Sequence, residues 1–484
     1  MSVLSQLDTG KRPDRVPAFQ NAAVSLSTAW DVWLSSGATS AHLQQLAHLR
    51  LQAIVAFARQ RSPFYRERYR DLPPGPWALN QLPVLTKQQL MANFDAVITD
   101  RTISTDAVQR FLCDPNRIGR PFLGRYAVWT SSGTTGEPAI YVHDGRALAV
   151  YEALQLIRFR RLQSPALLAT ALLANDRYAF VGATGGHFAG NASVERLRVL
   201  YPWLAHRVRT FSILEDISKL ARQLDHYQPT LLATYPTAAN LLADEQQRGR
   251  LAIRPREVWT GGEGLSEAQR LHIAQTFGCT VHDDYGSSEF LSIAWDCGQG
   301  ALHLNSDWVA LEAVDDCYRP VPPGVASHSV LLTNLANQVQ PLIRYDLGDS
   351  ITLLEHRCRC GSPFPAIRVE GRCDQVVVLS DGIEREVALL PLALTTVLED
   401  EAGVYQFQLL QVGASALRLR VSPEQAAAVV TRAQHALERY LRLQGLGNVT
   451  LVIERAPLVH HPASGKLQRI VARCAFEHGS TVRH

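Results

Sequence analysis

Apolar runs of strand length alternate with helical patterns through the middle of the chain. Residues 231–235 are followed by a helical pattern over 237–248, and residues 257–260 by one over 266–277. This alternation, which extends from about residue 167 to residue 285, predicts a mainly parallel sheet covered by helices. Ligands of such sheets lie beyond the carboxyl ends of the strands. The loops at 261–263 and 285–289 fall there, and we expect both to face one cleft.

The two ends of the chain have different patterns. Residues 50 to 90 are helical, interrupted by Pro63 and by a proline-rich run at 72–76. The last part of the chain instead predicts strands at 376–379, 404–410 and 417–421, a long helix, and a strand at 449–453. Ser422 is expected to cap that helix, with Pro423 in its first position and Gln425 completing a capping box.

A chain of 484 residues is longer than a domain with one hydrophobic core usually is, so two domains are expected. We predict an α/β protein. Its large N-terminal domain, residues 1–372, has helix-covered and mainly parallel sheets, and its small α+β C-terminal domain covers residues 373–484. The boundary is placed between Gly371 and Asp374.

Composition narrows the class of protein. With 46% hydrophobic and 19% charged residues, the chain has an ordinary globular composition. It has no apolar segment long enough for a signal peptide or a membrane span, which predicts a cytoplasmic location. A net charge of +3 is too mild to indicate nucleic-acid binding. The arginines at positions 158, 160, 161, 196, 198, 207 and 209 are expected on solvated faces.

The segment SSGTTGEP at 131–138 predicts a loop that holds phosphate oxygens. Gly133 and Gly136 allow backbone N–H groups to converge on an anion, and the hydroxyl groups supply further donors. Strand-like residues at 128–130 and 140–142 flank the loop. No lysine follows Gly136, which argues against a P-loop. Alone, the segment also fits a hydroxyl-rich surface turn.

Other motifs occur in a fixed order along the chain. They are the loop at 131–138, Gly261-Gly262-Glu263, YGSSE at 285–289, RYDLGD at 344–349, GRCD at 371–374 and SGK at 464–466. Together they resemble the adenylate-forming superfamily of acyl-CoA synthetases and adenylation domains, over nearly the whole chain. SPFYR at 62–66 and LPVLTK at 82–87 resemble its phenylacetate-CoA ligase branch.

The resemblance implies a reaction in two steps. A carboxylate attacks the α-phosphate of ATP and releases pyrophosphate, and a thiol then attacks the acyl-adenylate. Catalysis of the first step rests on positioning and on neutralising phosphate charge.

The resemblance also assigns residues. The nucleotide is expected at Ser131, Ser132, Gly133, Thr134, Thr135, Gly136, Gly261, Gly262, Glu263, Asp284, Tyr285, Gly286, Ser287, Ser288, Asp349 and Arg372. Asp349 would accept hydrogen bonds from both ribose hydroxyls, and Glu289 would hold Mg²⁺. Lys466 would reach from the C-terminal domain to the reacting groups, so Lys466, Glu289 and Arg372 are the expected catalytic residues. Asp374 matches the hinge about which that domain moves.

Gly186, His187 and Tyr285 are expected to border the acid pocket. For His187 there is an equal alternative to contact with the acid, a structural role in which backbone groups satisfy its hydrogen bonds.

The cysteines predict a further site. Eight cysteines in a cytoplasmic chain argue against disulfides. Cys297, His303, Cys358 and Cys360 could make a tetrahedral Cys₃His zinc site with a structural role, and some members of the resembled branch carry one. Free buried thiols are the alternative. The remaining cysteines, at 113, 279, 317, 373 and 474, show no ligand partners in the sequence.

One segment departs from the family pattern. At 380–387, beside the expected thiol tunnel, only Gly382 is kept, so the acceptor is left open between CoA and the phosphopantetheine of a carrier protein. The acid is expected to be aryl, with a fatty acid as the alternative. Two further alternatives remain for the function. The enzyme could transfer the acyl group to a non-thiol acceptor or stop at an AMP ester, or the protein could keep the fold without turnover. A homodimer is a possible assembly.

Overall fold

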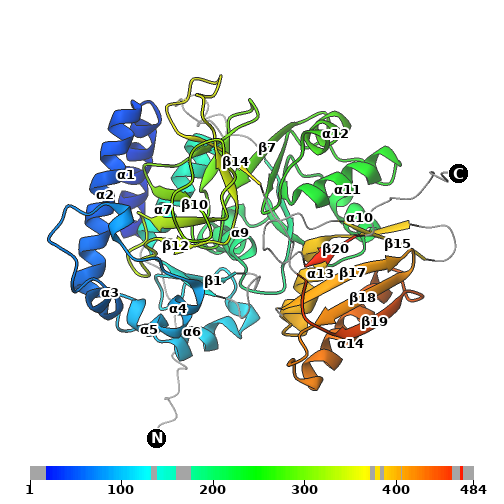
Figure 1. Ribbon diagram of the computed structural model, residues 1–484. Coiled ribbons are helices and arrows are strands. Elements are labelled where there is room, and N and C mark those ends of the chain that lie inside the picture. Colours follow the sequence, from blue (N-terminus) through cyan, green and yellow to red (C-terminus); the bar gives the residue numbers. More distant parts are fainter. Residues whose placement is uncertain are drawn as a thin grey trace, which may run out of the picture.

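The structure is a computed structural model of the chain. It describes residues 18–131, 139–159, 176–370, 376–381, 386–404, 406–459 and 469–472, with the side chains of 18–23, 392 and 400 left aside. A mixed sheet forms the centre, helices cover it, and a smaller α+β region lies at the lower right of the view (Figure 1). The predicted fold class is confirmed.

The central sheet has the strand order β13-β14-β9-β8-β7-β6-β5-β3-β4. Five strands are parallel: β4 (Val208–Ser212), β3 (Tyr178–Gly182), β5 (Leu231–Thr234), β6 (Glu257–Gly261) and β7 (Thr280–Tyr285). The next four are antiparallel: β8 (Ala294–Asp296), β9 (Leu302–Leu304), β14 (Ala366–Val369) and β13 (Ile351–Leu353). The alternation of strands and helices predicted the parallel half. It did not predict the antiparallel half, because the connections between β7, β8 and β9 are too short for crossover helices.

Helices follow the parallel strands as the sequence predicts. They are α9 (Ala189–Leu200), α10 (Ile217–Tyr227), α11 (Pro236–Gln247) and α12 (Glu267–Phe277). In α12, Ser266 and Gln269 form a capping box, and Gly278 ends the helix at φ 63°. The apolar faces of α10, α11 and α12 share one buried cluster with β3 and β5.

The N-terminal part is helical, with two small sheets. Its helices are α1 (Ala18–Ser36), α2 (Ser40–Arg61), α3 (Pro63–Arg68), α4 (Lys87–Ala92), α5 (Phe94–Val97), α6 (Thr105–Leu112) and α7 (Gly145–Leu154), with the short turns η1 (Leu79–Gln81), η2 (Pro115–Arg117) and η4 (Pro202–Leu204) and the π-helical turn η3 (Gln155–Phe159). The sheets are β1 (Ala127–Thr130) with β2 (Ile140–His143), and β10 (Val309–Val314) with β11 (Ser329–Asn334) and β12 (Tyr345–Asp346). The helix break predicted at Pro63 is present, with Ser62 as N-cap of α3.

The C-terminal region has its own sheet, in the order β19-β18-β17-β20. Its elements are β15 (Val377–Ser380), β16 (Glu386–Leu389), α13 (Pro391–Thr396), the π-helical turn η5 (Val397–Glu401), β17 (Phe407–Gly413), β18 (Ala416–Val421), α14 (Ala427–Leu443), β19 (Thr450–Arg455) and β20 (Ile470–Val471). Its apolar core extends onto Ile213 and Ala238 of the larger part, and Gln444 donates to the Leu214 carbonyl at 3.0 Å.

The predicted start of the long helix was wrong. α14 begins at Ala427, and its N-cap Ala426 makes no side-chain cap bond. The Ser422 hydroxyl instead accepts from the Glu424 amide at 3.4 Å, and the Gln425 amide donates to the Ser422 carbonyl at 3.1 Å. The serine thus stabilises a turn ahead of the helix, because its hydroxyl serves a turn as readily as a cap.

The exposed position predicted for Arg158 was also wrong. Its side chain is 1% exposed and makes a bidentate pair with Asp307 at 2.7 and 2.8 Å. Asn305, Ser35 and Ser36 accept its remaining hydrogen bonds, so a fully satisfied cation joins α1 and η3 to the segment before β10. Arg196 and Arg198 are partly exposed and pair with Glu152 and Glu195. Arg160 and Arg161 lie outside the described residues.

Candidate active site

The expected phosphate loop is presented by a hairpin. β1 and β2 pair antiparallel, with Thr130 opposite Ile140. The Ser131 amide donates to the Ala139 carbonyl at 3.0 Å, and the Ser131 hydroxyl accepts from the Ala139 amide at 3.2 Å. Ser131 therefore closes the mouth of the loop, and the flanking strands lie where the sequence predicts them. Ser132, Gly133, Thr134, Thr135 and Gly136 fall outside the described residues.

Two of the expected nucleotide loops lie side by side at the carboxyl edge of the sheet. β6 ends at Gly261 and β7 at Tyr285, with Gly261 paired to Asp284. A Cβ on Gly261 would lie 2.9 Å from the Asp284 carbonyl, and one on Gly286 would lie 2.1 Å from the Leu291 carbonyl. Only glycine permits these approaches. The Glu263 carboxylate is held by the Thr237 hydroxyl at 2.7 Å, at the start of α11, and Gly262 adopts φ 77°.

The RYDLGD motif at 344–349 also reaches the carboxyl edge of the sheet. The Tyr285 hydroxyl donates to the Asp349 carboxylate at 2.9 Å. Asp349 follows Gly348, whose φ is 71°. Strand β12, which leads into this turn, is bridged to the segment at 82–87: the Leu85 amide donates to the Arg344 carbonyl, and the Asp346 amide to the Leu85 carbonyl, both at 2.9 Å. Two motifs far apart in the sequence therefore form one unit.

Arg344 is a residue whose role the sequence did not indicate. It is buried at φ 50°, its guanidinium pairs with Glu312 at 2.8 and 3.0 Å, and it donates to the Leu82 carbonyl at 2.6 Å. These bonds fix the turn before Asp349, so Arg344 serves the structure of the motif.

Glu289 lies at the centre of the assembled loops. Its side chain is 7% exposed, and the Tyr141 hydroxyl donates a short hydrogen bond to it. The Tyr345 hydroxyl lies 2.9 Å from that of Tyr141, and Asn334 donates to the Glu289 carbonyl at 2.9 Å. Burial raises the pKa of Glu289, against the lowering effect of the Tyr141 hydrogen bond. A cation beside this carboxylate would favour its charged form.

The neighbouring Ser288 is held through its backbone. Its carbonyl accepts from Trp129 Nε1 at 2.8 Å and from His143 Nε2 at 3.1 Å. Burial lowers the pKa of His143 to about 3, so its ring is neutral. Nε2–H then donates to Ser288, while Nδ1 accepts from Tyr151 at 3.1 Å.

The sequence motifs did not single out Tyr141, Tyr345, Trp129 or His143 as neighbours of Glu289. Their positions in the sequence could have indicated this proximity, because each residue lies in a motif or in a strand flanking the expected phosphate loop.

Two adjacent carboxyl side chains, those of Asp283 and Asp284, lie near the end of β7. The Thr260 hydroxyl donates to Asp283 at 2.7 Å, and burial raises the pKa of Asp283 to about 6. Asp284 lies between the two glycine loops, with the Ser292 hydroxyl 3.4 Å away. Its pKa is raised, first by burial and then by the charge of Asp283.

The segment expected at the acid pocket lies beside β1. The His187 carbonyl accepts from the Thr130 amide at 2.9 Å, and the Gly186 carbonyl from Asn191 at 3.2 Å. The ring of His187 packs on Phe111, with Nε2 3.3 Å from the Asp114 carbonyl. The backbone therefore satisfies one ring nitrogen of His187, whereas Nδ1 is buried without a hydrogen-bond partner among the described residues. A contact with the acid stays a prediction.

Arg372, Asp374 and Lys466 lie outside the described residues, so their expected roles stay predictions.

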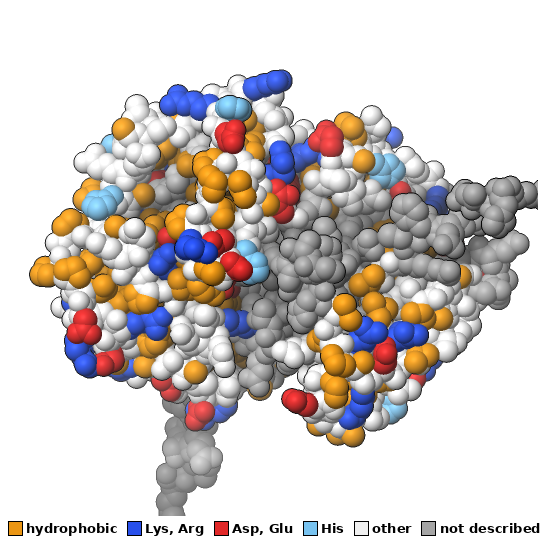
Figure 2. Space-filling view, in the orientation of Figure 1, with side chains coloured by type: hydrophobic (Ala, Val, Ile, Leu, Met, Phe, Trp, Pro, Cys, Tyr) orange, Lys and Arg blue, Asp and Glu red, His pale blue; other side chains and the backbone are white. Residues whose placement is uncertain are grey.

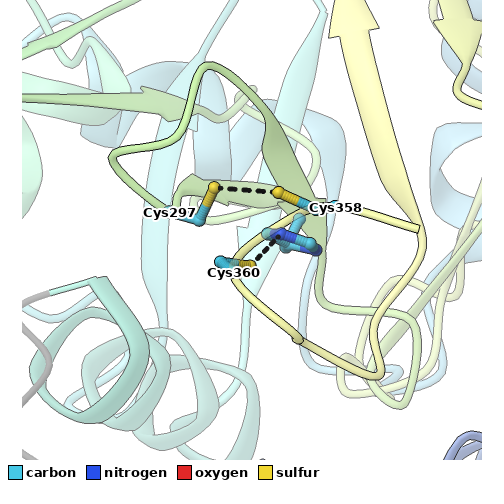
Figure 3. Close-up of side chains that lie close together, drawn as sticks. Cys297, Cys358 and Cys360 are labelled. Atoms are coloured by element: carbon cyan, nitrogen blue, oxygen red, sulfur yellow. Dashed lines mark hydrogen bonds between the residues drawn. The ribbon is translucent and has the colours of Figure 1, made fainter. Parts of the chain in front are cut away.

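The four predicted zinc ligands come together at the antiparallel edge of the sheet. Cys297 follows β8, His303 lies on β9, and Cys358 and Cys360 lie between β13 and β14. Their ligand atoms all fall within 4.8 Å of one another, with Cys297 Sγ 3.5 Å from Cys358 Sγ and His303 Nε2 3.1 Å from Cys360 Sγ. Figure 3 shows the three cysteines turned toward one another.

The second nitrogen of His303 has its own partner. Nδ1 lies 3.0 Å from the Phe364 carbonyl, a contact that requires Nδ1–H as donor and leaves the Nε2 lone pair facing the sulfurs. Three sulfurs and one imidazole nitrogen are the ligand set of structural zinc, so the residues fit the metal.

The comparisons with known proteins agree with the fold. No family model matches the chain. A phenylacetate-coenzyme A ligase of Thermus thermophilus is 25% identical over 464 residues, covering 89% of this chain and 96% of the relative. The enzyme of the same name from Aromatoleum evansii is 22% identical, covering 90% and 96%.

Among solved structures, a 2-hydroxyisobutyryl-CoA ligase in complex with 2-HIB-AMP and CoA superposes with a TM-score of 0.55 at 19% identity, covering 90% of this chain and 91% of that one. The fold is therefore that of this CoA ligase. In sequence, the chain is similar over most of its length to phenylacetate-coenzyme A ligases.

Among the described helices, none is long and apolar enough to cross a membrane. On the face shown in Figure 2, Lys and Arg side chains are interspersed with acidic and apolar ones and form no extended basic surface.

Proposed function

We propose that the protein joins a small carboxylic acid to the thiol of CoA, using ATP, in the cytoplasm. The acid's carboxylate oxygen attacks the α-phosphorus of ATP, and pyrophosphate leaves. The thiolate then attacks the acyl carbon of the adenylate, and AMP leaves. The observation that carries this proposal is the meeting of the hairpin closed by Ser131, the loops after β6 and β7, and Asp349 at one edge of the sheet.

The residues of this edge divide the work of the first step. The loop that begins at Ser131 would bind the phosphates, the loops at 261–263 and 284–288 would frame the base, and Asp349 would bind the ribose hydroxyls. Glu289 would hold Mg²⁺, which neutralises phosphate charge when bound. This assignment fits a buried carboxylate whose charged form lacks a cation among its described contacts. Lys466 and Arg372 would stabilise the charge that builds during attack.

The second step depends on the C-terminal region in this proposal. Residues 373–484 would turn against residues 1–372 about Asp374, withdrawing Lys466 and admitting the thiol. In this proposal, the thiol of CoA accepts the acyl group. The hairpin of β15 and β16 falls where the family pattern is lost, so a carrier-protein thiol is the second candidate. Both acceptors present the same phosphopantetheine arm.

The acid is proposed to be aryl, bound near Gly186, His187 and Tyr285. The support is the similarity to phenylacetate-CoA ligases. A fatty acid, or formation of an AMP ester on a non-thiol acceptor, is the alternative that the assay below distinguishes.

We also propose that Cys297, His303, Cys358 and Cys360 bind one structural zinc ion. The packing of the four ligand atoms and the hydrogen bond of His303 Nδ1 support it. In this proposal the metal ties two loops together and takes no part in the reaction, since the described nucleotide residues lie on other segments.

A homodimer through α1 is proposed as the assembly. The helix exposes an apolar stripe made of Leu26 (73% exposed), Trp30 (61%), Trp33 (40%) and Leu34 (54%). The rings of Trp30 and Trp33 stack at 5.0 Å. Asp31 is the single charged residue of the helix, and Arg50 holds it at 2.7 Å. A membrane-surface helix would carry Lys and Arg, whereas an uncharged aromatic stripe can face its own copy across a two-fold axis.

The reaction is tested by acid-dependent exchange of labelled pyrophosphate into ATP, over benzoates, arylacetates, cinnamates and fatty acids. We expect exchange with an aryl class. The variant Lys466→Ala should lose exchange but still form thioester from supplied acyl-adenylate, because the lysine acts only in the first step. Adding CoA or a carrier protein to the active acid then identifies the acceptor. Absence of exchange with every acid would contradict the proposal.

A further inference from the structure

The carboxylate of Glu289 is aimed by a chain of two buried tyrosines. Tyr141 and Tyr345 are 1% and 2% exposed. The Tyr141 hydroxyl bonds to Oε1 of Glu289 and lies 2.9 Å from the Tyr345 hydroxyl, and the two rings meet edge to face at 88°. A hydroxyl has one proton to donate. Because Tyr141 gives its proton to the carboxylate, Tyr345 must be the donor to Tyr141.

Both hydroxyls stay protonated in this arrangement. Burial, the largest cause for each, raises the pKa of Tyr141 and of Tyr345 well above the ordinary value. The order of donation therefore runs from Tyr345 to Tyr141 to Glu289, and each bond polarises the next.

The backbone around Glu289 is held separately from its carboxylate. Trp129 and His143 hold the Ser288 carbonyl, and Asn334 holds that of Glu289. Trp129, Tyr141 and His143 all belong to the hairpin that presents the expected phosphate loop. Moving this hairpin would move the Glu289 loop with it.

We propose that Tyr141, oriented by Tyr345, is a positioning residue that holds Oε1 of Glu289 and so fixes the orientation in which the carboxylate would meet the metal ion of the nucleotide. The hairpin that binds the phosphates thereby also sets the position of the metal ligand. This inference rests on the proposed function, because it assigns Mg²⁺-ATP to the site.

The test compares Tyr141→Phe with Tyr65→Phe. Tyr65 is a fully buried tyrosine whose hydroxyl donates to the Pro341 carbonyl at 2.8 Å, away from Glu289, so both variants lose one buried hydrogen bond. ATP binding is measured by calorimetry across Mg²⁺ concentration. We expect Tyr141→Phe to raise the half-saturating Mg²⁺ concentration about tenfold or more, since it loses a hydrogen bond to a charged group. Tyr65→Phe should leave the half-saturating Mg²⁺ concentration unchanged.

Tyr345→Phe and the double variant test the order of the chain. Because Tyr345 acts through Tyr141, Tyr345→Phe should have a smaller effect, and Tyr141→Phe/Tyr345→Phe should be no worse than Tyr141→Phe. Wild-type Mg²⁺ dependence of ATP binding in Tyr141→Phe would overturn the inference. Mg²⁺-dependent ATP binding without any acid-dependent exchange would instead count against the proposed reaction, and absence of Mg²⁺-dependent ATP binding by the wild type would overturn both.

Discussion

Asp349 and Tyr285 connect two motifs through one hydrogen bond. The Tyr285 hydroxyl occupies one position on Asp349 Oδ2. An ionised carboxylate offers about four acceptor positions, so the group can still accept both ribose hydroxyls. The interaction between the motifs and the proposed grip on the nucleotide can therefore coexist.

Replacing Asp349 should therefore remove discrimination at the ribose. In the wild type, 2′-deoxy-ATP should have a higher KM than ATP, because one donor is missing. In Asp349→Ala, the KM for ATP should rise about 10-fold to 100-fold, and the two nucleotides should become equivalent, since each hydrogen bond to a charged acceptor contributes strongly.

The measurement is pyrophosphate exchange at varied nucleotide concentration. Asp106→Ala, which removes an exposed carboxylate from the first turn of α6, is the control and should keep wild-type values. Continued preference for ATP in Asp349→Ala would assign the ribose to another residue.

At the scale of single residues, the order of motifs predicted that Glu289 and Asp349 lie at one site. The structure brings both to one edge of the sheet, and their chemical roles stay predictions. Arg158 shows what the sequence lacked. Its position in a basic run indicated an exposed side chain, whereas the partner that buries it, Asp307, comes from a distant segment. A charge is buried where the fold supplies its partner, and local sequence does not show that partner.

At the scale of elements, the four proposed zinc ligands join the β8–β9 hairpin to the loop between β13 and β14. Cys297 and Cys358 are 61 residues apart in sequence. A metal bridge would close this long loop in the folded state, so its binding free energy would add to folding stability.

Zinc removal should therefore lower the melting temperature. We expect about one zinc per chain by elemental analysis, and a fall of about 5 °C or more on chelation or in Cys360→Ser, which should also lose the metal. Cys113→Ser removes an exposed thiol that belongs to no candidate metal cluster and should change neither quantity. Zinc-free protein with full stability would contradict the site.

Helix ends show why local signals succeed or fail. The helical pattern over 266–277 predicted the start of α12, because those residues are helical without interruption, and Ser266 and Gln269 form a capping box there. The similar signal at Ser422 failed because β18 ends at Val421 and the chain first makes a turn. Capping side chains stabilise a helix end, and strand and turn geometry decide where that end lies.

At the scale of the whole molecule, the apolar stripe on α1 predicts a weak dimer. A whole tryptophan side chain has an accessible surface of roughly 250 Å². The exposed parts of Trp30 and Trp33 together therefore offer about 250 Å² for burial on each copy. With the leucines added, the stripe stays below the roughly 800 Å² per partner of a standard interface. The dimer should therefore dissociate on dilution.

Light scattering over a range of protein concentrations checks this prediction. Trp30→Glu should be monomeric where the wild type is dimeric, because it places like charges across the two-fold axis. Trp203→Glu changes a tryptophan of similar exposure, 66%, outside the stripe and should keep the wild-type association. A wild-type monomer at every concentration would rule out the assembly.

The large sheet also shows how far sequence patterns reach. The parallel strands were predictable, because each is followed by a helix whose period is clear. Strands β8, β9 and β13 have three residues each, too short to show a period of two, and they pair with partners remote in sequence.

That difference within one sheet has a consequence for how the chain folds. The parallel strands and their helices form through neighbouring segments, whereas β14 reaches β9 only after a long stretch of chain has been closed. Closure of that stretch costs entropy before any contact is gained, which slows the step. We therefore expect the antiparallel edge, which holds the cysteine cluster, to be the last part of the large sheet to fold.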